Sequence, residues 1–376
     1  MRHFCLLALV MILLTSLSYA QSETRSFTWD GTTREYIEYL PSSYSGDEPV
    51  PVVFALHGLG DNMSNFSGTG MHLIADTANF ISITPQALMA TYMGYEIGTA
   101  WNSGASMQGI VPNQDVDDVG FLMAILDSLD SHYNIDTDQV FFFGFSMGGY
   151  MCNKMACEAG NRINAIASVS GTMGNAYSPD PQEHTACLHF HGTADETVAY
   201  TGNNSGMDAD SLVNFWVDHN GNDTAAVVYE YPDSENDGLT FERYVYPNGT
   251  EQVAHIKVFG GAHEWYYFPN NDIDYAQEIW TFFTQRFSEE SDNASTGTHH
   301  RTDVSVFPNP AGDDIQLNFS NENHPHQLSL YDMQGRIVRS WEITTPPTKL
   351  CLQGISSGTY VLRSTDTDFS KKVVVK

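Results

Sequence analysis

The chain has 376 residues, of which 41% are hydrophobic, so it is long enough to form one large domain and a smaller second one. It carries 46 acidic residues against 16 basic residues, and its formal net charge is −30. This balance argues against nucleic acid and against anionic membrane surfaces as partners.

The first 20 residues have the pattern of an export signal. A basic start, Met1-Arg2-His3, precedes the apolar stretch Phe4–Leu17, and the small residue Ala20 comes just before the polar Gln21. We therefore predict that residues 1–20 are a secretory signal peptide cleaved after Ala20. The apolar stretch is too short to span a membrane, and no later segment reaches about 18 apolar residues, so we expect no membrane span.

Short apolar strands alternate with helical patterns through most of the chain. After an opening hairpin over residues 26–40, the expected strands are Val52–Leu56, Ile81–Thr84, Val140–Phe145, Ile166–Val169, Cys187–Phe190 and His255–Phe259. The expected helices are Val119–Leu129, Gly148–Glu158, Asp208–Asp218 and Asp274–Phe287. This alternation predicts an α/β domain with a doubly wound, mostly parallel sheet. The stretch Met89–Asn113 lacks periodicity, and we expect this irregular insertion to shape a substrate cleft.

A glycine-rich loop follows the first apolar strand. Val52–Leu56 leads directly into His57-Gly58-Leu59-Gly60. Such a loop can supply one backbone N–H to a developing oxyanion, and the residue after a nucleophilic serine can supply the other. We nominate the backbone N–H groups of Leu59 and Met147, and we expect His57 to be structural.

An acidic cluster precedes the predicted helix Val119–Leu129. Asp115, Asp117 and Asp118 can bind calcium or can cap the helix, and we favour the cap. The histidines have no metal-ligand partner at useful spacing. The sequence therefore implies no metal and no organic cofactor.

The centre of the chain has the pattern of a nucleophile elbow. Phe141–Phe143 predicts a buried strand, a helical pattern comes after Gly149, and Gly144-Phe145-Ser146-Met147-Gly148 lies between them. A strand, a tight turn and a helix in this order expose the serine and aim the helix N–H groups at the reacting centre. We predict that Ser146 is a nucleophile. The alternative is a glycine-rich turn that happens to contain a serine.

A serine nucleophile needs a base and an acid that orients the base. Downstream, Cys187–Phe190 runs into a loop that ends in Asp195, and His255–Phe259 runs through two glycines to His263. Both residues follow strands at their carboxyl ends, where open α/β sheets place their sites. We assign Asp195 as the acid and His263 as the base. Taken singly, each also fits an ordinary loop residue.

These motifs together resemble those of secreted esterases related to polyhydroxybutyrate depolymerases, feruloyl esterases and acetylxylan esterases. The resemblance covers roughly residues 25–288 and rests on His57-Gly58-x-Gly60, Trp101-Asn102, Asp117-Asp118-Val119-Gly120-Phe121, Gly144-x-Ser146-x-Gly148-Gly149, His191-Gly192-Thr193-Ala194-Asp195 and Gly260-Gly261-Ala262-His263. It implies an α/β-hydrolase with the triad Ser146, Asp195 and His263.

The chain departs from that family in two places. Tyr266 follows Trp265 where members often have a proline, and Ser103-Gly104-Ala105-Ser106 follows Asn102 where members carry cysteine. Trp101 and Trp265 can stack on an aromatic acid or a sugar ring, or they can pack beneath the loops. We take both as candidate substrate-binding residues.

The composition changes after Phe287. Residues 289–302 are polar and small and predict a linker. Short alternating strands in residues 303–376 then predict a small β-sandwich. This segment resembles the C-terminal sorting domain of the type IX secretion system in Bacteroidetes, which implies contact with that machinery and export through the outer membrane. The alternative is a sandwich that binds carbohydrate.

Four cysteines remain after signal cleavage. A disulfide between Cys157 and Cys187 is possible in an exported protein, and buried free thiols fit equally well.

The sequence therefore predicts a secreted or cell-surface serine carboxylesterase of residues 21–288 that releases feruloyl or acetyl groups from polysaccharide. A polyester depolymerase, a serine peptidase and a non-catalytic carbohydrate-binding protein are the alternatives.

Overall fold

The computed structural model describes residues 21–106, 109–233, 237–267, 270–286, 304–307, 311–312, 314–319, 327–331, 337–343, 348–364 and 370–376. The predicted signal peptide, residues 1–20, and the predicted linker, residues 289–302, lie outside the described residues. Within the described part of the chain, no helix is long and apolar enough to cross a membrane.

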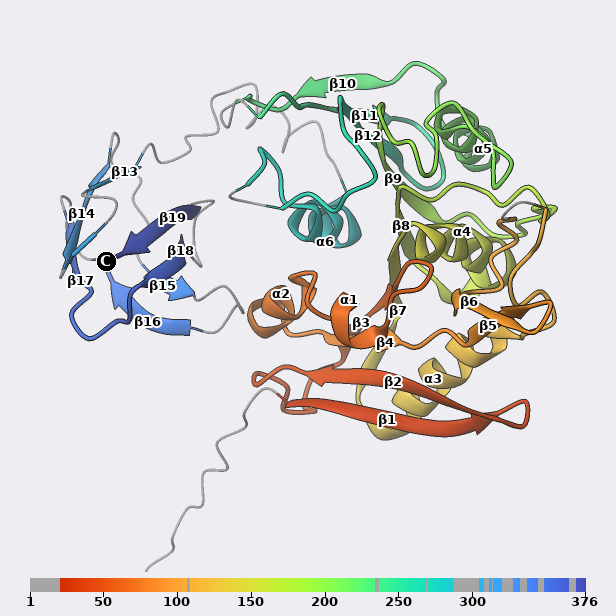
Figure 1. Cartoon of the computed structure of the whole chain (residues 1–376), viewed down its shortest axis with the longest axis horizontal. Helices are drawn as coiled ribbons and strands as arrows, with labels where there is room; N and C mark the ends of the chain where they lie inside the picture. The colour runs from red at the N-terminus through yellow and green to blue at the C-terminus, as the bar shows by residue number, and fades with distance from the viewer. Residues whose placement is uncertain are drawn as a thin grey trace, which may run out of the picture.

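A ten-stranded sheet forms the main body of the protein (Figure 1). Its strands, in spatial order, are β1 (Gln21–Trp29), β2 (Thr32–Leu40), β4 (Ile81–Pro85), β3 (Val50–Leu56), β7 (Ile135–Phe145), β8 (Ala165–Val169), β9 (Ala186–Gly192), β12 (Val253–Phe259), β11 (Thr240–Tyr246) and β10 (Val227–Glu230). The six strands from β4 to β12 are parallel, and an antiparallel pair flanks them on each side. The predicted α/β class with a mostly parallel sheet is confirmed.

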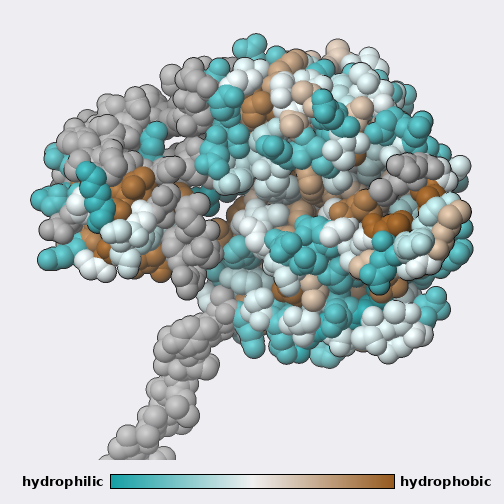
Figure 2. Space-filling model, in the orientation of Figure 1, coloured by the Kyte–Doolittle hydropathy of each residue, from teal (hydrophilic) through white to brown (hydrophobic). Residues whose placement is uncertain are grey.

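Helices cover both faces of this sheet. α3 (Asp118–His132), α4 (Met147–Ala159) and α5 (Ala209–Asn220) bury their apolar residues in one core. α1 (Met63–Phe66), α2 (Met71–Ala78) and α6 (Tyr275–Gln285) bury theirs in a second core on the opposite face. A 3₁₀ turn, η1 (Gly160–Arg162), ends α4. On the face seen in Figure 2, hydrophilic residues cover most of the surface, and hydrophobic residues gather in a few places.

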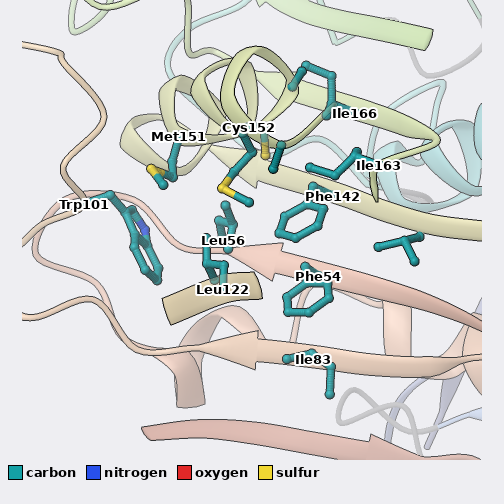
Figure 3. Packing of buried hydrophobic residues seen from close by; sticks show 14 of the residues in the cluster. Phe54, Leu56, Ile83, Trp101, Leu122, Phe142, Met151, Cys152, Ile163 and Ile166 are labelled. Carbon is teal, nitrogen blue, oxygen red and sulfur yellow. The ribbon is translucent and has the colours of Figure 1, made fainter. Parts of the chain in front are cut away.

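The aromatic run of β7 shows why this strand is buried on both faces. Phe142 lies in one core, where its ring stacks on Phe54 at 4.3 Å between centroids (Figure 3), whereas Phe141 and Phe143 lie in the other core. Successive side chains of a strand point to opposite faces, so a continuous apolar run fits a central strand covered by helices on both sides.

Several elements differ from the sequence predictions. The stretch Met89–Asn113 is not irregular throughout, because it contains the hairpin of β5 (Met89–Tyr92) and β6 (Tyr95–Thr99). The short helices α1 and α2 and the outer strands β10 and β11 were not predicted. α1 and β10 have only four residues each, and β11 carries the charged residues Glu242 and Arg243 at its centre, so their apolar pattern is weak.

The C-terminal residues form two small antiparallel sheets. One contains β13 (Val304–Phe307), β14 (Asp314–Phe319) and β17 (Thr348–Cys351), and the other contains β16 (Ile337–Glu342), β15 (Gln327–Tyr331), β18 (Gly358–Ser364) and β19 (Ser370–Val375). Both sheets contribute to one separate core, for example through Leu317, Leu350, Leu330 and Leu362. This arrangement agrees with the predicted β-sandwich.

Candidate active site

Ser146 lies at the sharp turn between β7 and α4. It has φ 55° and ψ −120°, a strained conformation for a residue with a side chain. A Cβ on Gly148 would come within 1.9 Å of the Leu56 carbonyl oxygen, and one on Gly144 would come within 2.4 Å of Gly148. The two glycines of the motif are therefore required by the close approach of α4 to the strands.

The loops after β9 and β12 lie side by side because these strands pair in parallel, with Gly192 opposite Val258. Thr193 N–H donates to the Val258 carbonyl at 2.8 Å, and Ala194 N–H donates to the Gly261 carbonyl at 2.9 Å. These bonds hold the loop of Asp195 against the loop that leads to His263. Strand pairing thus brings together two residues that are 68 positions apart in the chain.

Asp195 and His263 form a close pair. His263 Nδ1 lies 2.7 Å from Asp195 Oδ2. A carboxylate oxygen only accepts, so Nδ1–H is the donor, and in a neutral ring with this tautomer Nε2 carries the lone pair. The ring of His263 also lies 4.8 Å from the ring of Phe145, the residue before Ser146. The predicted acid, base and nucleophile therefore come from three loops at the same edge of the sheet.

Several groups keep Asp195 ionised although its side chain is buried. The N–H groups of Thr197 and Val198 donate to Asp195 Oδ1 at 2.9 and 2.8 Å. Burial by itself raises the pKa of this carboxyl, but His263, the Val198 amide and His191 outweigh it and hold the pKa below its ordinary value. An ionised acid is what the base requires as an orienting partner.

His191 contacts the loop that carries Asp195. Its Nε2–H donates to the Val198 carbonyl at 2.7 Å and lies 3.6 Å from Asp195 Oδ2. The side chain is fully buried, and burial lowers the pKa of His191. His189 Nε2 lies 3.1 Å from His191 Nδ1, and the ring of His255 stacks on His189 at 5.3 Å. The sequence analysis did not detect this link between His191 and the loop of Asp195.

The loop after β3 lies against the serine turn. A Cβ on Gly58 would lie 3.3 Å from the Ser146 Cβ. His57 is completely buried; its Nδ1–H donates to the Gly58 carbonyl at 2.7 Å, and its Nε2 accepts from the Ala87 N–H at 3.1 Å. Burial lowers the pKa of His57, and both ring nitrogens have partners, which fits the structural role expected for it. Leu59 follows directly after Gly58.

The substrate-binding prediction for Trp101 is wrong. Its side chain is 0% exposed, and its indole Nε1–H donates to the His57 carbonyl at 2.9 Å. Figure 3 shows the ring packed beside Leu56 and Met151. Trp101 therefore supports the loop after β3 from inside. Trp265 is partly exposed, and its ring contacts Phe143 and Phe145 and other core aromatics, so its role remains a prediction.

The acidic cluster before α3 has structural partners. Asp117 caps the helix by accepting from the Gly120 N–H at 2.8 Å, as expected. Asp118 pairs with Arg34 at 2.7 Å, and both side chains are 1% exposed. The second oxygen of Asp118 accepts from the Asn102 N–H at 2.7 Å, which fixes the Trp101–Asn102 loop. In the described ranges, no three His, Cys, Asp or Glu residues are grouped to hold a metal ion.

The four described cysteines are all free thiols. The disulfide considered between Cys157 and Cys187 is therefore absent, and Cys152, Cys157 and Cys187 are buried. Burial raises the pKa of Cys157 to about 12, so this thiol stays protonated at neutral pH.

Two family models match the chain. The model described as Phospholipase/Carboxylesterase matches residues 43–227, which include the serine turn and the acid loop. The model described as Secretion system C-terminal sorting domain matches residues 305–376. The region that matches the carboxylesterase model lies in the part of the chain that forms the ten-stranded sheet. The region that matches the sorting-domain model follows it in the chain.

Similar proteins carry esterase names. A bifunctional acetylxylan esterase/xylanase of Neocallimastix patriciarum is 27% identical over 259 residues, which are 68% of this chain and 34% of that protein. Feruloyl esterase D of Neurospora crassa is 30% identical over 168 residues, 44% of this chain and 54% of that protein. A probable feruloyl esterase C of Aspergillus niger is 29% identical over 232 residues, 61% of this chain and 76% of that protein. The chain thus spans about a third and about half of the first two relatives.

An acetyl xylan esterase from Aspergillus awamori aligns with a TM-score of 0.49 and 16% identity, over 68% of this chain and 99% of that chain.

Proposed function

We propose that the esterase domain hydrolyses carboxylic esters with Ser146 as nucleophile, His263 as base and Asp195 as orienting acid. The observation that carries this proposal is the 2.7 Å contact between His263 Nδ1 and Asp195 Oδ2, beside a strained serine turn. A Ser-His-Asp arrangement recurs on unrelated folds as the machinery of acyl transfer.

In this mechanism, His263 Nε2 takes the proton of Ser146 as the hydroxyl oxygen attacks the ester carbonyl. The backbone N–H groups of Leu59 and Met147 stabilise the oxyanion; such donors are typically worth about 3 kcal/mol each. His263 then returns the proton to the alcohol as the bond to it breaks, which leaves Ser146 acylated. Water attacks the acyl group in the same way, and the acid is released. Asp195 stabilises the imidazolium throughout.

The proposed substrates are feruloyl or acetyl esters on polysaccharide. The names of the relatives support this choice, as does the sorting domain, which favours a substrate too large to import. A polyester is the alternative within the esterases. Trp265 is proposed to contact the acyl group, because it is partly exposed and close to the ring of Phe145.

The sorting domain supports export to the cell surface or the extracellular space. We propose that residues 1–20 are removed as a signal peptide, that residues 21–288 form the esterase domain, and that residues 289–302 link it to the sorting domain, residues 303–376. In this proposal the last segment contacts the type IX secretion machinery.

Mutation of the serine tests the catalytic proposal. Ser146→Ala should lose labelling by a fluorophosphonate probe and should lower kcat on p-nitrophenyl acetate by at least about 10⁴-fold. The matched control is Ser178→Ala, at an exposed serine outside the serine turn, which should keep the parent activity. Parent turnover by Ser146→Ala would overturn the proposal.

A substrate panel then identifies the ester. Release of ferulate or acetate from arabinoxylan and from methyl ferulate supports the proposed substrates. Clearing of a polyester film without such release supports the polyester alternative. Cleavage of peptides alone would indicate a peptidase, and a parent protein that no fluorophosphonate labels would be a non-catalytic binder.

A further inference from the structure

The hairpin β5–β6 exposes an unusual amount of hydrophobic surface. Met89, Tyr92, Met93 and Tyr95 are 46%, 40%, 79% and 76% exposed. They account for four of the nine large hydrophobic side chains that are exposed among the described residues. The two strands form a sheet of their own at the right of the view in Figure 1, and Figure 2 shows hydrophobic residues gathered on that side.

Tyr92 and Tyr95 form a pair on this hairpin. They are direct partners in the strand register, so their side chains project from the same face with Cβ atoms about 5 Å apart. The turn between them, Met93-Gly94, has positive φ at both residues, 49° and 82°. Hairpin turns of this kind favour Asn or Gly at the first position, so Met93 is an uncommon residue there. The tip therefore presents two phenol rings beside a thioether.

The root of the hairpin is held firmly beside the candidate active site. Asn113 Nδ2 donates to the carbonyls of Leu88 and Ala100 at 3.0 and 2.7 Å. These two residues lie just before β5 and just after β6, so Asn113 ties the two strands together at the root of the hairpin. Gly60 N–H donates to the Thr99 carbonyl at 2.8 Å. Gly60 follows directly after Leu59, the nominated oxyanion donor, so this hydrogen bond joins the root of the hairpin to the loop after β3.

The tip of the hairpin lies several residues along the strands from its root. β5 begins four residues after β4 ends, at the carboxyl edge of the parallel strands where Ser146 lies. At about 3.4 Å per residue, Tyr95 lies roughly 14 Å along the strand from Thr99. That distance exceeds the length of an acetyl or feruloyl group. The tip could therefore contact the polysaccharide chain to which such a group is attached, rather than the group itself.

We propose that the hairpin β5–β6 is a docking arm for a neutral polysaccharide, in which Tyr92 and Tyr95 stack on sugar rings while an ester of the same chain lies at Ser146. This inference rests on the proposed esterase function and deepens it. Tyrosine presents an apolar ring face and a polar hydroxyl, which matches the C–H faces and hydroxyl groups of a sugar.

The charge of the esterase domain favours a neutral occupant. Residues 21–288 contain 35 acidic and 7 basic residues. Such a surface repels an anionic polysaccharide, an anionic membrane and a second copy of the same domain. A neutral sugar chain is not repelled by this surface.

Two variants test the proposal while keeping the hairpin. The double variant Tyr92→Thr/Tyr95→Thr retains β propensity, and it can be made with or without Met93→Asn, which suits the turn better than methionine does and should give the same results. On feruloylated or acetylated arabinoxylan, the double variant should raise KM by about tenfold with little change in kcat, because two aromatic contacts distant from the reacting atoms are lost. On methyl ferulate or p-nitrophenyl acetate its kcat/KM should equal that of the parent.

Binding gives a second readout that needs no turnover. In the full-length Ser146→Ala protein, retention on insoluble neutral arabinoxylan should fall by a similar factor when Tyr92 and Tyr95 are replaced. The matched control is Val227→Thr/Val228→Thr, which removes exposed hydrophobic side chains from β10 at the far edge of the sheet. This control should bind and hydrolyse the polymer as the parent does.

The outcomes separate this inference from the proposed function. Equal effects of the Tyr92/Tyr95 double variant on polymer and small esters, or an unchanged KM on polymer, would overturn the docking arm while leaving the esterase intact. A change in oligomeric state or in vesicle binding, without a change on polymer, would also overturn it. A parent that hydrolyses no ester refutes the proposed function instead, and the retention assay still decides whether the arm binds sugar.

Discussion

Replacement of His255 by asparagine should make the free energy of unfolding of the domain with the ten-stranded sheet depend less on pH. His255 is 3% exposed in the core behind the acid loop, and its Nδ1–H donates to the His189 carbonyl at 3.0 Å. Burial, reinforced by the charge of His191, lowers the pKa of His255 from 6.5 to about 4, although the bond to His189 opposes this shift. Asparagine keeps a donor near the position of Nδ1 but cannot titrate.

The size of the effect follows from linkage. Below pH 6.5 the unfolded chain binds a proton at His255, whereas the folded chain stays neutral there until about pH 4. Stability therefore falls as the pH decreases through this window. A shift of that size corresponds to about 3 kcal/mol in total, most of which is lost by about pH 4.5. For a domain of this size, this loss of stability should lower the melting temperature by about 8 °C at about pH 4.5 relative to neutral pH.

The assay is chemical unfolding at about pH 7 and about pH 4.5, followed by near-ultraviolet circular dichroism. The difference between the two pH values should be smaller in His255→Asn than in the parent by about 2 to 3 kcal/mol. His132→Asn, at an exposed histidine of α3, measures the effect of the exchange itself. Equal pH dependence in parent and His255→Asn would refute the reasoning. A parent stabilised by acid relative to the variant would mean that folded His255 takes up a proton. Its contact with the Tyr200 hydroxyl, which itself donates to Asp210, would permit this.

Three further predictions concern the acid, a buried ion pair and the thiols. Asp195→Asn should lower kcat by about 10⁴-fold without loss of fold, because an amide N–H opposite His263 Nδ1 favours the wrong tautomer; activity within tenfold of the parent would contradict this. Asp118→Asn should destabilise the protein by about 3 to 5 kcal/mol in thermal unfolding, because Arg34 is left as a buried unpaired charge. A thiol reagent should label Cys351 alone among the four described cysteines in the native protein, and all four after unfolding without reductant, because burial raises the thiol pKa of the other three.

The serine turn was predictable from sequence because its determinants are local. An apolar strand, two glycines around one serine and an apolar helix are contiguous, and the geometry at Gly148 shows why no larger residue fits there. The central strands and the long helices were predictable for the same reason, since each carries its own apolar period. The burial of Trp101 was not, because a tryptophan in an aperiodic loop has no pattern that distinguishes a core residue from a surface one.

Order along the chain could nominate Asp195 and His263, but only strand pairing could bring them together. β9 and β12 lie side by side because the sheet places them so, and the loops after them then meet. The contact of His191 with the acid loop and the exposed face of Tyr92 and Tyr95 also depend on that placement. By itself the sequence determined which residues can do chemistry, because side-chain type and local turns are encoded in neighbouring residues. The tertiary structure decided which of them meet and which face water, because contacts between distant segments depend on how the whole sheet packs.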